Sequence, residues 1–102
     1  MATDKEMKIY RLEVWAATDN QYKWAYHPLS DFYSDKDYLT KLKEEFENTY
    51  NEIDKKYPEE YQIMDLFNEW HKYLSSKCIE KGTEIYDTHA FMPEIREYTL
   101  KH

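Results

Sequence analysis

Two helical apolar patterns meet at a proline near the middle of the chain, and they limit the possible folds more than any other feature of the sequence. In the first pattern, large apolar side chains recur every three or four residues on a stripe that covers less than a third of a helix circumference: Leu39, Leu42, Phe46, Tyr50, Ile53 and Tyr57. Pro58 ends this pattern, because a residue before proline is pushed out of the helical region, whereas proline itself fits the first turn of a new helix. We therefore expect two helices joined at Pro58, each with one apolar face that needs a partner layer.

Residues typical of helix ends flank these patterns. Ser34 is followed by Asp35 and Asp37, and a serine hydroxyl followed by acids is typical of a helix start. Gly82, the only glycine of the chain, follows Lys81 and is typical of a helix C-terminus. The second apolar stripe covers nearly half of its circumference, which predicts that the second helix packs more deeply than the first: Ile63, Met64, Leu66, Phe67, Trp70, Tyr73, Leu74 and Cys78.

Strand-like segments lie on both sides of the helical patterns. Residues 7–15 combine β-branched and aromatic side chains, and residues 22–26 alternate large aromatic side chains with smaller or charged ones. The turn residues 18–20 between them predict an antiparallel hairpin. After the helices, residues 83–91 alternate as a third strand, while residues 94–100 fit either a fourth strand or one helical turn.

These elements predict an α+β fold in a single domain, residues 1–102. The N-terminal hairpin and one or two C-terminal strands form a small antiparallel sheet, and the two-helix unit broken near Pro58 covers one face of it. Residues 1–6 are small and charged, so we expect them to be frayed.

The charge balance is acidic, with 14 Lys and Arg residues against 21 Asp and Glu residues and a formal net charge of −7. No dense run of Lys or Arg offsets this balance, so direct binding of nucleic acid is disfavoured. With one glycine, the chain also has no glycine-rich phosphate loop. A partner protein with a basic surface is the better electrostatic match.

Cysteine usage and hydropathy favour a cytoplasmic protein. Cys78 is the only cysteine, so it cannot form an intramolecular disulfide that would indicate an oxidising compartment. Residues 1–8 lack the apolar run of a signal peptide, and no stretch approaches the ~20 apolar residues of a membrane span. We expect no contact with a membrane.

The metal ligands that the chain offers are badly spaced. His71 and Cys78 are seven residues apart on one helix face, which places them ~10 Å apart along the axis, because each residue rises 1.5 Å. One zinc ion needs its ligands within about 2.0–2.3 Å, so this pair does not fit one ion. We expect a core role for Cys78, and neither a metal nor another cofactor.

Asp87 and His89 are the strongest candidates for catalysis, because two residues that alternate on a strand point to the same side. They suit a base and the group that orients it, but no nucleophile accompanies them in the sequence. Cys78 lies near a helix C-terminus, where the dipole disfavours a thiolate. A small enzyme or ligand-binding protein that uses Asp87 and His89 is therefore the alternative to a binding module.

The first helix carries acids that a partner can contact. Glu44, Glu47 and Asp54 lie along one flank, and carboxylates presented in this way can mimic the phosphates of DNA. However, Lys56 stands four residues after Glu52, and other lysines of this helix are spaced likewise, which predicts surface ion pairs worth about a few tenths of a kcal/mol. Pure DNA mimicry is therefore not favoured.

Aromatic residues are in excess, with three Trp, eleven Tyr and four Phe. A core of this size does not hold all of them, and Tyr and Trp are enriched at protein interfaces. We therefore expect a non-enzymatic acidic protein-binding module that occludes a basic surface of a nucleic-acid-processing host protein. A small inhibitor carried by a phage or another mobile element would fit this role. The candidate partner-binding residues are Trp15, Tyr22, Tyr26, Glu44, Glu47 and Asp54.

Overall fold

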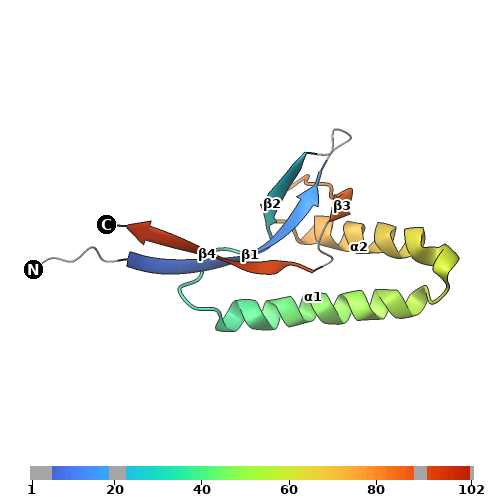
Figure 1. The fold of residues 1–102 in the computed structure, drawn as a ribbon, viewed down its shortest axis with the longest axis horizontal. Helices are drawn as coiled ribbons and strands as arrows, with labels where there is room; N and C mark the ends of the chain where they lie inside the picture. The colour runs from blue at the N-terminus through green and yellow to red at the C-terminus, as the bar shows by residue number, and fades with distance from the viewer. Residues whose placement is uncertain (1–5, 19–22, 89–91, 102) are drawn as a thin grey trace, which may run out of the picture.

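The computed structural model describes residues 6–18, 23–88 and 92–101, and it confirms the α+β fold with an antiparallel sheet (Figure 1). The elements follow in the order β1 (Glu6–Ala17), β2 (Trp24–Pro28), α1 (Asp37–Lys56), a 3-10 turn η1 (Glu60–Gln62), α2 (Ile63–Lys77), β3 (Asp87–Thr88) and β4 (Glu94–Lys101). The segment 94–100, for which the sequence left strand and helical turn open, is a strand.

β1 is the central strand of the sheet, since every other strand pairs with it. Its first eight residues pair with β4, from Glu6 opposite Lys101 to Glu13 opposite Glu94. Its last five residues pair with β2, and the last two of these also pair with the two-residue β3. The expected hairpin is confirmed, whereas the third strand expected over 83–91 is only Asp87–Thr88 among the described residues of that range. Residue 6, expected to be frayed, already belongs to β1, because β4 pairs with it.

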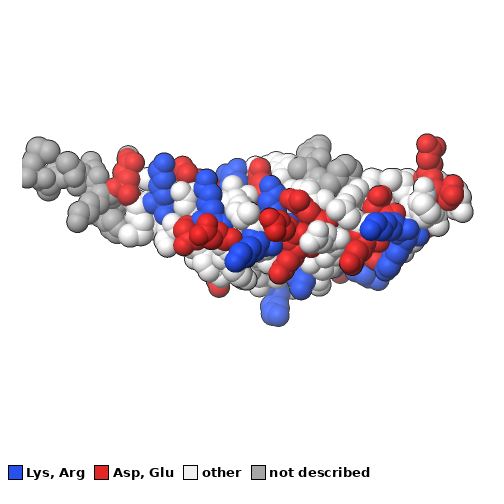
Figure 2. Space-filling model, turned by 90° about the horizontal axis from the view of Figure 1, so that it is seen from below, with Lys and Arg blue, Asp and Glu red and all other residues white. Residues whose placement is uncertain are grey.

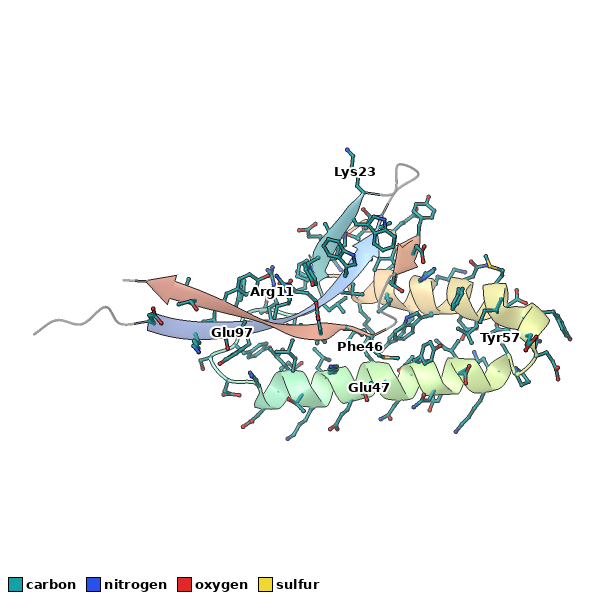
Figure 3. The ribbon with its side chains drawn as sticks, in the orientation of Figure 1. Arg11, Lys23, Phe46, Glu47, Tyr57 and Glu97 are labelled. Carbon is teal, nitrogen blue, oxygen red and sulfur yellow. The ribbon has the colours of Figure 1, made fainter. Side chains whose placement is uncertain are left out.

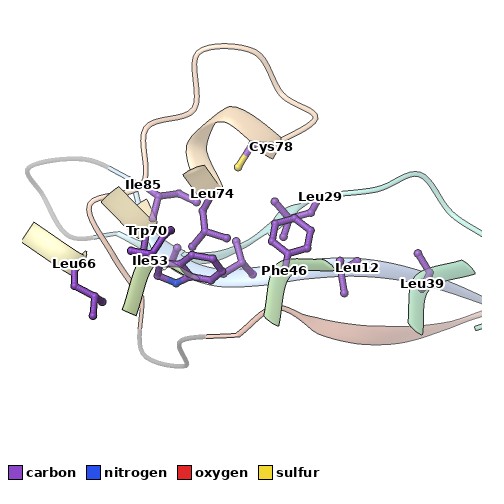
Figure 4. Packing of buried hydrophobic residues seen from close by; sticks show 12 residues of the cluster. Leu12, Leu29, Leu39, Phe46, Ile53, Leu66, Trp70, Leu74, Cys78 and Ile85 are labelled. Carbon is purple, nitrogen blue, oxygen red and sulfur yellow. The ribbon is translucent and has the colours of Figure 1, made fainter. Parts of the chain in front are cut away.

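Both helices lie on the same side of the sheet, with α1 alongside the β1–β4 ribbon (Figure 1). The core forms where the even-numbered side chains of β1 meet the buried stripes of the two helices (Figure 4). Its main members are Leu12, Val14, Ala16, Leu39, Phe46, Ile53, Leu66, Trp70 and Leu74. Each fully buried Leu, Val, Ile or Phe side chain contributes about 1.5–3 kcal/mol, so this layer dominates the stability of the fold.

The helix pair is a hairpin with its turn at Pro58, as the sequence predicts. α1 ends at Lys56, Glu59 is extended, and the amide of Glu59 donates to the side chain of Gln62 (3.1 Å) before α2 begins. Aromatic edge contacts join the helices, between Phe46 and Tyr73 and between Tyr50 and Trp70.

Three helix details differ from expectation. Lys36 is the N-cap of α1, and the carboxylate of Asp35, rather than the Ser34 hydroxyl, accepts a hydrogen bond from the amide of Asp37. α2 ends at Lys77, and Gly82, with φ 85°, turns the chain five residues later. α2 is not markedly deeper than α1, since each helix buries three side chains and Ile63 and Met64 are exposed.

Candidate functional site

The two faces of the sheet differ in chemistry. Residues directly opposite one another in paired strands share a face, so the register places Arg11 beside Arg96, and Trp15 beside Tyr26. Because Leu12, Val14 and Ala16 point to the helices, the odd-numbered side chains of β1 and their partners lie on the other face, as Figure 3 shows for Arg11. We call it the outer sheet face and define it by Arg11, Glu13, Trp15, Trp24, Tyr26, Phe32, Arg96 and Tyr98.

Glu13 lies at the centre of the outer sheet face and is completely buried. Its carboxylate accepts a hydrogen bond from Nε of Arg11 (2.6 Å), and the hydroxyl of Tyr98 lies 2.7 and 2.9 Å from its two oxygens. Nε of Arg96 is 3.8 Å away. Two arginines directly opposite each other in a sheet repel, so the carboxylate between them is what allows Arg11 and Arg96 to share this face.

Aromatic rings pack against the guanidinium groups of Arg11 and Arg96. Arg96 lies 3.8 Å over the ring of Tyr26, and Arg11 lies 4.3 Å over the ring of Phe32. Phe32 in turn makes an edge contact with Tyr98 at 5.6 Å. The face therefore already contains cation–π pairs made by the chain's own arginines.

A second aromatic group continues the face along the β1–β2 hairpin. Trp15 stacks on Trp24, with ring centroids 6.4 Å apart, and packs against Tyr26 at 4.8 Å. All three side chains are half-buried. The pKa of Tyr26 is raised, mainly by its hydrogen bond with Glu94 and to a smaller extent by burial. Its phenol therefore stays neutral and keeps the proton that it donates in this hydrogen bond.

The structure divides the predicted partner-binding residues between two surfaces. Trp15 and Tyr26 belong to the outer sheet face, and Tyr22 lies outside the described residues. The acids of the predicted set are exposed on α1: Glu44, Glu47 and Asp54. Figure 3 shows Glu47 on α1, which lies on the opposite side of the sheet from Arg11. A single flat partner surface therefore cannot contact both groups.

Acids on the outward side of α1 do not form a uniform acidic surface, because basic and acidic side chains alternate there (Figure 2). Lys56 binds Glu69 of α2 at 2.7 Å rather than Glu52, so the expected pair within α1 is wrong and a pair between the helices takes its place. The hydrogen bonds that Glu69 accepts from Lys56 and Tyr57 lower its pKa.

Asp87 lies beside a hollow next to α2. It lines a cavity of about 300 Å³ together with His71, Phe67, Tyr86 and two further residues. Burial lowers the pKa of His71, and the nearby carboxylate of Asp87 partly opposes this shift. His89, the other residue of the catalytic alternative, lies outside the described residues.

Cys78, one of the two metal-ligand candidates of the sequence, is a buried thiol at the end of α2. Cys78 is buried, and burial raises the pKa of its thiol to about 11, so it stays protonated at neutral pH. Within residues 6–18, 23–88 and 92–101, no group of three or more His, Cys, Asp or Glu side chains is arranged to hold an ion.

Sequence reasoning missed the residues that anchor the outer sheet face, namely Arg11, Glu13, Phe32, Arg96 and Tyr98. The available signal is that Arg11 and Glu13 alternate in phase with Trp15, and that Arg96 and Tyr98 alternate within a candidate strand. Joining the two sets requires the register of β1 with β4, which links residues 85 positions apart.

No protein-family model matches the chain, and neither the curated proteins nor the solved structures include a match. No helix in the described part of the chain has the length and apolar character needed to cross a membrane.

Proposed function

We propose that this protein is a non-enzymatic binding module that occupies a surface of another protein with its outer sheet face. The observation that carries the proposal is the array of Trp15, Trp24, Tyr26 and Arg96 on the side of the sheet that neither helix covers. Tryptophan, tyrosine and arginine are the residue types that contribute most to binding at protein interfaces.

The order of this face supports the proposal. Arg11 and Arg96 are fixed by the buried carboxylate of Glu13, and each also lies over an aromatic ring. Side chains held in place before binding lose less conformational entropy when the complex forms. The face is therefore suited to a rigid partner surface.

We expect the partner to have a basic surface, because the chain as a whole carries a net charge of −7. The outer sheet face itself carries Arg11 and Arg96 around the buried Glu13, so this attraction acts through the rest of the chain during encounter. Charge of one sign accelerates encounter with a surface of the other sign, and contacts at the aromatic face then slow dissociation. A groove of a nucleic-acid-processing protein has this chemistry, and occluding it would inhibit that protein.

The test compares capture of partners from the source lysate by the wild-type chain, by Trp15→Ser and by Tyr38→Ser. Tyr38 is a half-exposed aromatic residue at the start of α1, is not part of the outer sheet face, and serves as the matched control. We expect Trp15→Ser to weaken the complex at least tenfold while Tyr38→Ser leaves it within about twofold, as expected for an interface hot spot. The association rate of the captured partner should fall as salt is raised.

One observation supports the alternative, a small enzyme or ligand-binding protein that uses Asp87 and His89. Asp87 and His71 line the same hollow. Asp87→Asn and His89→Ala separate the two proposals. The binding module requires both variants to keep the biological effect. Loss of that effect in either variant, with no partner recovered, would establish the alternative.

A further inference from the structure

The tip of the helix hairpin exposes apolar side chains to an unusual degree. Tyr61 is 82% exposed, Met64 is 62% exposed, and Ile63 between them is also exposed. Figure 1 shows this tip extending beyond the sheet, so no strand covers it. Clustered exposed apolar side chains are disfavoured in water and typically mark a surface that another molecule covers.

The apolar tip continues into a groove along α2. Met64, Phe67 and Tyr86 line the hollow of about 300 Å³, and Tyr86 is itself half-exposed. A second hollow of about 460 Å³ shares Asn68, His71 and Tyr86 with the first. The two hollows are therefore neighbours on the surface of α2, and we call the pair the α2 groove.

One acidic side chain lines each hollow of the α2 groove, and another follows Met64 on the helix. Asp87 lines the first hollow, Asp65 follows Met64 on the helix, and Glu84 lines the second hollow beside Lys72. Residues 52–69 contain six acidic and two basic residues, a net charge of −4 out of −7 for the whole chain. Of these, Lys56 and Glu69 neutralise each other, so the remaining charge around the tip is still acidic.

We propose that the α2 groove binds a segment of another protein in which one apolar side chain is flanked by lysine or arginine residues. The apolar side chain enters the hollow formed by Met64, Phe67 and Tyr86, and the flanking cations face Asp87 in the first hollow and Glu84 in the second. The charge around the groove selects this occupant, because an acidic segment would meet like charge at each of these positions. The groove and the outer sheet face share no residue, so this proposal stands or fails separately from the proposed function.

The test uses a defined probe, an N-acetylated and C-amidated nonapeptide with a central leucine, four lysines and four glycines. Titration of the isotopically labelled full chain, followed by backbone amide NMR, should give the largest shifts at residues 61–71 and 84–87. Replacing the leucine of the peptide by serine should weaken binding at least tenfold, because the hollow then receives no apolar side chain. Replacing the lysines by glutamates should abolish binding.

Variants of the protein locate the site. Met64→Ser and Asp87→Asn change exposed side chains, so the fold should be retained, and each should weaken binding of the leucine peptide at least fivefold. Ile79→Ser and Glu44→Gln are the matched apolar and acidic controls, both exposed and outside the groove, and should stay within twofold.

Three results would overturn the proposal. The first is equal binding of the leucine and serine peptides, which would indicate general electrostatic attraction. The second is unchanged binding by Met64→Ser with a native spectrum. The third is a shift pattern centred on the acids of α1 or on the outer sheet face. Trp15→Ser, which tests the proposed function, should bind the peptide like the wild-type chain.

Discussion

Leu12 and Glu13 are neighbours in β1 and both are completely buried, but they lie on opposite faces of the sheet. Leu12 is covered by a helical layer and packs among apolar side chains. Glu13 has no helix above it, and is enclosed by Arg11, Arg96 and Tyr98 of its own sheet. Burial therefore arises in two ways along one strand, by a second layer on one face and by long side chains of the same layer on the other.

The energetics of the two faces differ accordingly. The inner face, which is the face that the helices cover, is stabilised by the burial of apolar surface. This stabilisation depends on how much apolar surface leaves water and little on any single contact. The outer sheet face is stable only if each buried charged group keeps its hydrogen-bonding or ion-pair partner. A buried carboxylate or guanidinium group that loses its partner still bears the cost of removal from water. Such a cluster fixes one arrangement of side chains more than it stabilises the fold.

The largest loss of stability should follow from truncating a core side chain on the inner face. Leu12→Ala should lower the free energy of unfolding by about 2–5 kcal/mol, because the helices cannot collapse fully into the space that is left. Met7→Ala, in the same strand but half-exposed, should stay within about 0.5 kcal/mol. Equal losses in the two variants, measured by denaturant unfolding, would contradict the assignment of the core to the inner face.

Removing the central carboxylate of the outer sheet face should give the second-largest loss of stability. Glu13→Ala should reduce stability by about 2–4 kcal/mol, somewhat less than for a wholly buried pair, because Arg11 and Arg96 are partly exposed and water can solvate them. Glu97→Ala removes the exposed partner of Lys8 and should change stability by less than about 1 kcal/mol. If Glu13→Ala were as mild as Glu97→Ala, the outer face would not depend on its partners.

A smaller loss should follow from removing one hydroxyl. Tyr98→Phe keeps the ring against Phe32 but deprives the carboxylate of Glu13 of a donor, which should cost about 1–2 kcal/mol. Tyr61→Phe is the control for removing the hydroxyl of a highly exposed tyrosine and should be near neutral. Indistinguishable unfolding midpoints for the two variants would show that Arg11 and Arg96 satisfy Glu13 without Tyr98.

Pro58→Ala should have a still smaller effect, below about 1 kcal/mol, because proline between two helices acts mainly through the unfolded chain. Helical circular dichroism should be unchanged, since Glu59 is extended and α2 has its own start. A marked rise in helicity would mean that α1 and α2 merge, which would also remove the inner layer from half of the sheet.

The last prediction concerns pH. Burial lowers the pKa of His71 below its ordinary value of 6.5, with Asp87 opposing, so the folded state takes up a proton less readily than the unfolded chain. This contribution to stability is fully present above the unfolded pKa and is lost as pH falls below 6.5. Wild-type stability should therefore decline more in this window than that of His71→Gln, and parallel curves would contradict the shift.

The helices and the fold class are predictable from the sequence because both depend on local periodicity. The stripe from Leu39 to Tyr57 and the break at Pro58 are visible in one pass along the chain. Helix ends are less predictable, since Ser34 and Gly82 are good capping residues, but Lys36 caps α1 and Cys78 caps α2 in their place.

The anchor of the outer sheet face was not predictable, because it depends on register. Alternation assigns Arg11 and Glu13 to one side of β1, but it does not say which residue of another strand lies opposite them. Only the pairing of Arg11 with Arg96 shows that the carboxylate of Glu13 lies between two cations. Trp15 and Tyr26 were found by their residue type alone, without the geometry that joins them.

The pairing of β1 with β4 also has a consequence for how the chain folds. Contacts such as that between Tyr98 and Glu13 connect positions 85 residues apart, so the first strand completes its ladder only when the last one docks. Closing such a long loop is entropically unfavourable, and high contact order slows folding relative to a helical bundle of the same size. The helix hairpin has local contacts, so it should form early in folding. The sheet should form later, because β1 completes its hydrogen bonds only when β4, the last strand, pairs with it.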